Sequence, residues 1–277
     1  LYNGRLQHLK GIIPSKSFAE MFATPRQTVI QLRTYLQDHE VYTAPSFESY
    51  IKSLMAYRKY HPEEFPNTDH VHTVWTVLLR EVNRKGNEYR EQGQMAPTQR
   101  EKEGNKLTMG DLKKVMDSLD DGDERKLLLA MYLLIPPMRA DYGEVEILPF
   151  GHVPTTRNFI YLSSDRAVMQ IGDHKMASTL GPIREVLPDS LQRVLYTSIR
   201  TNPRSYLFGP YSGPRFSAWA NKQLTKLLGM PFTLTMFRHI YISHLPIHEM
   251  TVEEKKQIAY LMGQTFNPNQ QDLYRWI

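Results

Sequence analysis

The chain has 277 residues, of which 41% are hydrophobic and 23% are charged, a balance that is ordinary for globular proteins. Its length exceeds one average domain and suits two. The absence of cysteine excludes disulfides and thiolate zinc sites, no run of about 18 apolar residues predicts a membrane span, and no signal peptide pattern opens the sequence. The net charge of +5 weakly favours contact with nucleic acid phosphates.

The first third of the chain is predicted to be entirely helical, with interruptions at Pro14 and Pro25. Residues 24–40 place apolar side chains on one helical face. A turn at 44–46 then leads to a second helix, with Ser46 as its expected cap. A third helix is predicted over 68–92, with an apolar face formed by Val71, Val74, Val77, Leu78 and Val82.

The basic residues of this third helix, Arg80, Arg84, Lys85 and Arg90, lie largely off its apolar face. They are typical either of a solvated face or of a side that contacts DNA. Residues 93–106 are polar, contain Gly and Pro, and have the composition of a linker. We therefore predict a helical domain over 1–95, a linker over 96–106 and a second domain over 107–277.

The second domain is predicted to be mainly helical, with one small antiparallel sheet. Thr108 and Asp111 form an approximate capping box, and the helix over about 123–135 is apolar nearly all round and stops at Pro136-Pro137. Residues 158–162 and 167–171 predict a hairpin, with a third strand at 183–187. Helices are expected over 189–200, with Asp189 as cap, and over 216–229, 234–245 and 251–262, whereas 205–217 reads as a loop.

Four residues of this domain stand out for their chemistry. Arg139 follows the apolar helix and the Pro-Pro break, although pairing with Asp141 or Glu144 is the plainer interpretation of a helix-end arginine. Lys175 lies in the loop between the second and third strands, and by itself is typical of a surface lysine. Arg238 starts within an apolar helix face, where a buried guanidinium needs partners. Tyr274 lies in a polar segment.

Together these residue types match the needs of DNA strand cleavage without a metal. Charge develops on the non-bridging phosphate oxygens, and two arginines held on different elements would stabilise it. A lysine or histidine supplies the proton for the leaving 5′ oxygen. A tyrosine attacks, with help from a base or a strong local field because its pKa is near 10.

In their order and spacing these residues resemble the tyrosine recombinase (phage-type integrase) family, over roughly residues 107–277. Arg139 matches the family's first arginine, Lys175 its hairpin lysine, Arg238 its second arginine within an Arg-His pair, and Met262-Gly263-Gln264 its glycine turn. Tyr274 follows Gln264 by ten residues. The segments PPMRADY and LFGPYSGPRFS look most like integrases of eukaryotic DNA viruses and related mobile elements.

Two positions depart from the family pattern. Thr235 stands where the family has the first His of His-x-x-Arg, and Gln264 stands where it has His or Trp. Thr235 can hydrogen-bond a phosphate oxygen but is no base near neutral pH, and Gln264 donates a hydrogen bond but no proton. The proton acceptor for Tyr274 is therefore unassigned, and His239 is interpreted as structural because it points about 100° away from Arg238 on a helix.

The resemblance implies a site-specific recombinase that cleaves and rejoins double-stranded DNA through a 3′-phosphotyrosyl link. It implies no metal, ATP or other cofactor, no membrane, a homotetramer on DNA, and a location wherever the target DNA is, in the nucleus or cytoplasm of a host cell. Its catalytic set is Arg139, Lys175, Thr235, Arg238, Gln264 and Tyr274. The alternatives are a type IB topoisomerase and a catalytically weakened DNA-binding relative; a metal nuclease is disfavoured because acidic residues do not cluster at motif spacing.

Overall fold

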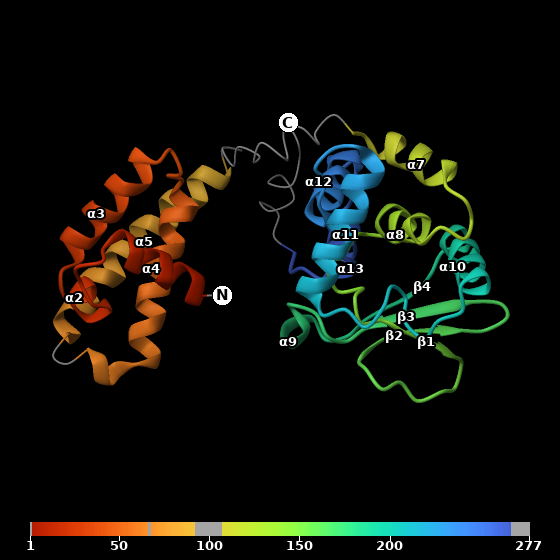
Figure 1. The fold of residues 1–277 in the computed structure, drawn as a ribbon, viewed down its shortest axis with the longest axis horizontal. Coiled ribbons are helices and arrows are strands. Elements are labelled where there is room, and N and C mark those ends of the chain that lie inside the picture. Colours follow the sequence, from red (N-terminus) through yellow and green to blue (C-terminus); the bar gives the residue numbers. More distant parts are fainter. Residues whose placement is uncertain (1, 66–67, 92–106, 267–277) are drawn as a thin grey trace. The chain divides into compact units, whose positions relative to one another are not determined.

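The computed structural model describes residues 2–65, 68–91 and 107–266. Its contacts divide the chain into two compact units, Leu1–Ala96 and Pro97–Ile277, which we call the N-terminal and C-terminal units. The chain is mainly helical with one small sheet, which confirms the predicted class (Figure 1). None of the helices in these residues is both long and apolar enough to cross a bilayer.

The N-terminal unit, within its described residues, is built from helices. Trp75, Phe22 and Phe47 are fully buried at its centre, and the Trp75 indole N–H donates to the Phe22 carbonyl oxygen at 2.7 Å, so the largest core side chain has its polar atom satisfied. The elements are α1 (Tyr2–Ile12), α2 (Phe18–Ala23), α3 (Pro25–Asp38), α4 (Ala44–Tyr60), η1 (Pro62–Glu64) and α5 (Asp69–Glu91).

Helix α4 begins earlier than its sequence predicted. Thr43 occupies the N-cap, and its hydroxyl accepts the Ser46 backbone N–H at 3.1 Å. Pro45 lies in the first turn, where a missing N–H costs nothing and the fixed φ suits a helix. The predicted turn at 44–46 and the predicted Ser46 cap were therefore wrong.

The predicted apolar face of α5 was only partly right. Val71 and Val82 are buried, but Val74 and Val77 are 43% and 59% exposed. Trp75 is fully buried instead, because burying its large ring outweighs burying two valines and sets the rotation of the helix about its axis.

The C-terminal unit places a sheet against a group of helices; in Figure 1 the sheet lies below α8, α11, α12 and α13. Helix α8 carries an unbroken buried stretch from Leu127 to Leu133, as its apolar sequence predicted. The elements are α7 (Met109–Ser118), α8 (Glu124–Leu133), β1 (Glu146–Pro149), β2 (Asn158–Leu162), β3 (Ala167–Ile171), α9 (Ala177–Leu180), β4 (Ile183–Val186), α10 (Asp189–Thr201), α11 (Gly213–Leu228), α12 (Leu234–His244) and α13 (Val252–Leu261).

The sheet has the order β1-β2-β3-β4 and is mixed. Strands β2, β3 and β4 pair antiparallel as predicted, whereas β1 was not predicted and pairs parallel to β2, with Glu146 opposite Phe159. Glu146 is buried there, and its carboxylate accepts backbone N–H groups of Thr155 and Thr156 at 2.8 and 3.2 Å. A charged residue at a buried position hid this strand from the hydrophobic pattern.

Two further helix starts differ from the prediction. Pro188 occupies the N-cap of α10, so Asp189 is the first helical residue rather than the cap. Helix α11 begins at Gly213, within the segment predicted as a loop. The predicted end of α11 is confirmed, since Gly229 has φ +67° at the C-cap. The capping boxes of Thr108 with Asp111 and of Thr251 with Glu254 are confirmed too.

Candidate active site

Arg139 is held by its backbone on the segment that leaves α8. Pro136 and Pro137 prevent the helix from continuing, and the Tyr132 hydroxyl donates to the Arg139 carbonyl oxygen. The Arg139 backbone N–H donates to the Asp141 carboxylate at 3.1 Å. Two different side chains thus fix the main chain from which this guanidinium projects.

The Arg139 side chain is half-buried and reaches a segment more than 120 residues away in sequence. Its Nη1 donates to the carbonyl oxygen of Gly263 at 2.8 Å. Within the described part of the chain this is the only hydrogen bond of the guanidinium, and no carboxylate lies within ion-pair distance of it. The predicted alternative, a helix-end ion pair with Asp141 or Glu144, is therefore not formed by the side chain, which keeps donors for an anion.

Arg238 is only 3% exposed, as its place in an apolar helix face predicted. From α12 its Nη1 donates to the carbonyl oxygens of Pro137 and Met262, at 2.7 and 3.0 Å. Its Nη2 donates to the Gln264 side-chain oxygen at 2.8 Å. The guanidinium therefore ties together the segment before Arg139 and the turn after α13, two elements that the sequence keeps far apart.

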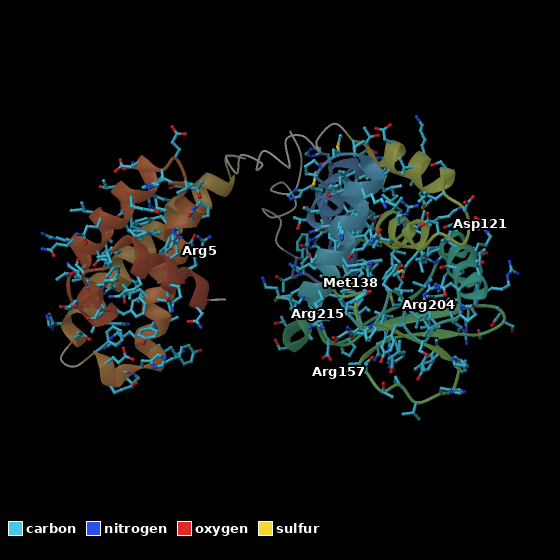
Figure 2. All side chains as sticks on the ribbon, viewed as in Figure 1. Arg5, Asp121, Met138, Arg157, Arg204 and Arg215 are labelled. Carbon is cyan, nitrogen blue, oxygen red and sulfur yellow. The ribbon has the colours of Figure 1, made fainter. Side chains whose placement is uncertain are left out.

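The turn after α13 requires glycine at position 263. Gly263 has φ +63°, and a Cβ built on it would lie 3.0 Å from the Cε atom of Met138. Met138 is labelled in Figure 2. Backbone N–H groups of Gly263 and Gln264 donate back to Tyr260 and Ala259 at 2.9 and 3.0 Å. This tight reversal presents the Gly263 carbonyl oxygen to Arg139.

Lys175 lies in the loop between β3 and α9, as predicted, and its side chain is exposed. The start of this loop is fixed by Asn158, a buried residue of β2. The Asn158 Oδ1 atom accepts the N–H groups of Gly172 and Asp173 at 2.9 and 2.7 Å, and its Nδ2 donates to the carbonyl oxygens of Asp173 and Asp141. Asn158 therefore joins the lysine loop to the segment that carries Arg139.

His174, which precedes Lys175, brings the loop against the glycine turn. Its Nε2 is 2.9 Å from the Gly181 carbonyl oxygen, so this nitrogen carries the hydrogen. Its Nδ1 is buried without a hydrogen-bond partner and lies 3.6 Å from the position of a Cβ on Gly263. The imidazole thus lies between the two ends of the lysine loop and the turn that accepts from Arg139.

Asp141 lies among these positive groups. Burial raises the pKa of the Asp141 carboxyl, while the charges of Arg139, His174 and Arg238 act in the opposite direction. The Asp141 carboxylate accepts the Arg139 backbone N–H, and the Asp141 carbonyl oxygen accepts from Asn158, so the arginine segment and the lysine loop meet at this residue. The guanidinium groups, Gly263 and His174 form one connected site.

The remaining members of the predicted set have different positions. Thr235 is exposed on the first turn of α12, three residues before Arg238. Gln264 is 6% exposed, and its side-chain oxygen is engaged by Arg238. Tyr274 lies outside the described residues. The structure thus brings together Arg139, Arg238 and Gln264, and brings the lysine loop to them through His174.

Sequence reasoning missed Asn158 and gave no role to His174. Asn158 reads as the first residue of a strand, and only the structure shows its four hydrogen bonds. A polar amide at the start of an otherwise apolar strand was the available signal, since a buried amide needs partners.

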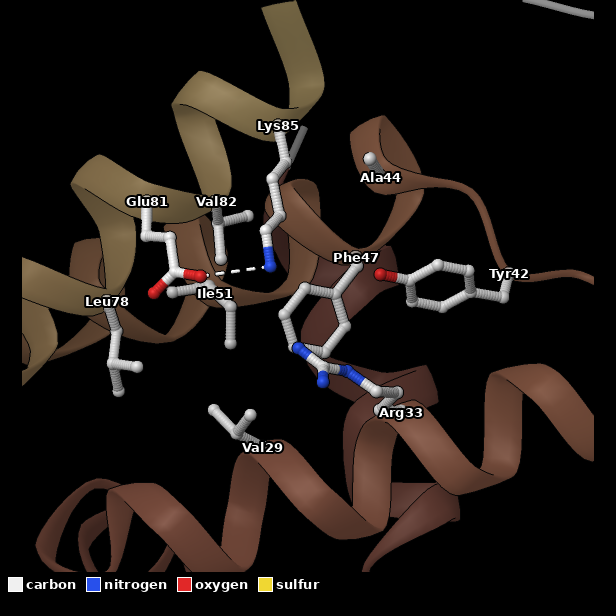
Figure 3. A pocket seen from close by; sticks show the side chains of 10 residues that line it. All are labelled: Val29, Arg33, Tyr42, Ala44, Phe47, Ile51, Leu78, Glu81, Val82 and Lys85. Carbon is white, nitrogen blue, oxygen red and sulfur yellow. Dashed lines mark ion pairs between the residues drawn. The ribbon is translucent and has the colours of Figure 1, made fainter. Parts of the chain in front are cut away.

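A pocket in the N-terminal unit offers no comparable chemistry. Its floor is apolar, and at its rim Lys85 pairs with Glu81 at 2.9 Å while Arg33 lies over the Phe47 ring at 5.4 Å (Figure 3). Its carboxylate, Glu81, is paired with Lys85, and we interpret the pocket as a gap in helix packing. Its lining residues are Val29, Arg33, Tyr42, Ala44, Phe47, Ile51, Leu78, Glu81, Val82 and Lys85.

No model of a known protein family matches the sequence, and a search of curated proteins found no significant match.

Proposed function

We propose that this chain is a tyrosine-type DNA strand transferase, a site-specific recombinase. One observation carries the proposal: hydrogen bonds join residues 137–139, Arg238 and the turn at 262–264. Arg238 lies about a hundred residues after the first segment and a few tens of residues before the turn. These are the segments that the tyrosine recombinase pattern selects, and their joining by hydrogen bonds supports the proposal.

The cations of the site suit phosphate chemistry. The open guanidinium donors of Arg139 are aimed from a fixed backbone, so they would bind a non-bridging phosphate oxygen with little reorganisation. Arg238 adds positive charge and holds the turn that orients Arg139. The exposed ammonium of Lys175 is suited to donating a proton to the leaving oxygen.

The proposed step is a balanced exchange of phosphate esters. The Tyr274 hydroxyl gives its proton to solvent water and its oxygen forms a bond to phosphorus, while the bond from phosphorus to the 5′ oxygen breaks. That oxygen takes a proton from Lys175 and leaves as a 5′-hydroxyl, and the 3′ end remains linked to Tyr274. Attack by a 5′-hydroxyl of a partner strand reverses the exchange, so no phosphate ester bond energy is lost.

A catalytically weakened DNA-binding relative is the second candidate, and the position of Gln264 favours it. Gln264 is buried with its oxygen occupied by Arg238, so in this arrangement it serves the internal framework of the site. Thr235 is exposed and supplies at most a hydrogen bond. Neither residue replaces the imidazole that the family pattern has at these two positions.

Covalent trapping tests the proposal. Duplexes that bind the full chain are first selected from a random pool. A nick is then placed so that the short cleaved fragment diffuses away, and adducts are sought on a denaturing gel in EDTA. We expect a protein–DNA adduct that Tyr274→Phe abolishes and that Tyr206→Phe, a change on a tyrosine outside the site, preserves. An adduct that survives Tyr274→Phe would contradict the assignment of the nucleophile.

Binding without any adduct would favour the weakened relative. If an adduct forms, a second assay separates the remaining enzymes. Strand exchange between two duplexes, with four protomers in the complex, is expected of the proposed recombinase. Relaxation of a supercoiled plasmid by a monomer, without exchange, would instead indicate a type IB topoisomerase.

A further inference from the structure

The loop that carries Lys175 is anchored at two points of the candidate site. At its start, Asn158 accepts the N–H groups of Gly172 and Asp173. Further along, the His174 Nε2–H donates to the Gly181 carbonyl oxygen at 2.9 Å and so closes the loop on itself. Lys175 follows this anchored histidine directly, so the path of its backbone depends on the imidazole.

The same imidazole lies close to the other half of the site. Its Nδ1 is 3.6 Å from where a Cβ on Gly263 would lie, and the Gly263 carbonyl oxygen accepts from Arg139. The Nδ1 atom is buried and unpartnered, which costs free energy and is tolerated where another requirement fixes the ring. The requirement that the geometry offers is packing of the lysine loop against the Gly263 turn.

We infer that His174 is a positioning residue that sets the distance between the Lys175 ammonium and the Arg139 guanidinium. This inference rests on the proposed function, because it assigns Lys175 the task of protonating the leaving oxygen. Proton transfer is sensitive to small displacements of the donor, whereas the charge of the loop still attracts DNA after a displacement. Loss of the anchor should therefore slow the proton transfer and leave DNA binding intact.

The substitutions His174→Asn and His174→Gln form a matched pair of neutral amides. Gln has the reach to donate to the Gly181 carbonyl oxygen, as Nε2 does, and Asn is too short for it. We expect His174→Gln to retain most of the activity and His174→Asn to slow adduct formation by about 30-fold, which is less than the roughly 100- to 10,000-fold that a general acid contributes, because Lys175 is displaced and not removed. His152→Asn, at an exposed histidine of the same unit, is the control and should match the wild type.

The deciding readout is a substrate whose bridging 5′ oxygen is replaced by sulfur, because a thiolate leaves without being protonated. On this substrate His174→Asn and Lys175→Ala should both react within about threefold of the wild type, since no acid is needed. The variant that combines His174→Asn with Lys175→Ala should be no slower than Lys175→Ala on the oxygen substrate. Both changes impair the same proton transfer, so their effects should not add.

Equal loss on the oxygen and sulfur substrates would assign His174 a purely structural role and overturn the inference. Wild-type rates for both amide variants would overturn it too. Failure of the proposed function gives a different result, since the wild type would then form no Tyr274-dependent adduct with either substrate. If His174→Asn fails to fold, His174→Gln decides: a small loss confined to the oxygen substrate supports the inference, whereas no loss, or an equal loss on both substrates, contradicts it.

Discussion

Two cations of helix α5, Arg84 and Lys85, and the two arginines of the candidate site have different kinds of hydrogen-bond acceptor. On α5, Lys85 pairs with Glu81 at 2.9 Å and Arg84 pairs with Glu88 at 2.5 Å, one turn apart on an exposed surface. In the C-terminal unit Arg139 donates to a backbone carbonyl oxygen, and Arg238 donates to two carbonyl oxygens and an amide oxygen. Carboxylates pair with Arg84 and Lys85, whereas the acceptors of these hydrogen bonds from Arg139 and Arg238 are neutral.

This difference bears on where an anion would bind. An exposed pair of Lys or Arg with Glu stabilises the fold little and is screened by salt. A guanidinium held by carbonyl dipoles keeps its full charge and a fixed direction, which is the arrangement that stabilises charge developing in a transition state. The comparison therefore favours the solvated-face interpretation of Arg84 and Lys85 and the phosphate-binding interpretation of Arg139.

The largest effect is expected from Arg139→Ala. Removing one preorganised donor of this kind costs about a hundred- to a thousandfold in rate, so adduct formation should fall by that factor while DNA binding changes little. The rate of adduct formation is measured on denaturing gels of samples quenched at successive times, and DNA binding is measured on native gels. Arg125→Ala is the control, because Arg125 already pairs with Asp123 at 2.5 Å, and its rate should stay near that of the wild type. A comparable loss in both variants would remove the distinction between the two kinds of cation.

Gly263→Ala should destabilise the C-terminal unit and displace the carbonyl oxygen that orients Arg139. The left-handed backbone alone costs a non-glycine residue about 1–2 kcal/mol. Here the new methyl group would also press on Met138 at 3.0 Å. Gly229→Ala is a matched control with φ +67° and no neighbour within 4 Å, so it isolates the backbone cost. Urea unfolding should show a larger loss for Gly263→Ala, and only this variant should slow adduct formation. Equal losses would show that Met138 gives way.

How far the sequence predicted this site depended on the kind of interaction. The order Arg139, Lys175, Arg238 and Gln264 was readable because each residue lies beside a recognisable helix end, hairpin or glycine turn. Local capping boxes were readable for the same reason. The roles of Asn158 and His174 could not be predicted. His174 bonds to Gly181 within the lysine loop and Asn158 bonds to Asp141, and hydrophobic periodicity reports nothing about such contacts. Strand β1 was missed because buried Glu146 broke its apolar pattern.

A smaller, pH-dependent effect is expected from Glu185 on β4. Burial raises the pKa of this carboxyl to about 7, and its charge acts on Tyr241, whose pKa burial raises to about 12. Because the folded state holds this proton more tightly than the unfolded state, the wild type loses stability as the pH rises from about 4.5 through 7. Glu185→Gln avoids that loss. The free energy of unfolding of the variant should exceed that of the wild type by about 1 kcal/mol at pH 8 and should equal it at pH 4. This figure is discounted because the Glu185 carboxyl is partly exposed to solvent.

Urea unfolding of both proteins across this pH range measures the difference. Stability curves that run parallel from pH 4 to pH 8 would show that solvent reaches the carboxylate well enough to keep it ionised without cost. Such a result would also weaken the view that this side of the sheet has a low local dielectric.

The smallest effect is expected at the α5 surface, from Arg84 and Glu88. Their side chains are 59% and 46% exposed, so a double-mutant cycle to alanine should give a coupling free energy of about 0.5 kcal/mol or less. The coupling should vanish in high salt. A pair this weak opens readily when a phosphate competes for the arginine. The salt dependence of DNA binding by Arg84→Ala therefore completes the comparison: a slope reduced by about one would make Arg84 a phosphate contact despite its carboxylate, and an unchanged slope would leave α5 as a solvated face.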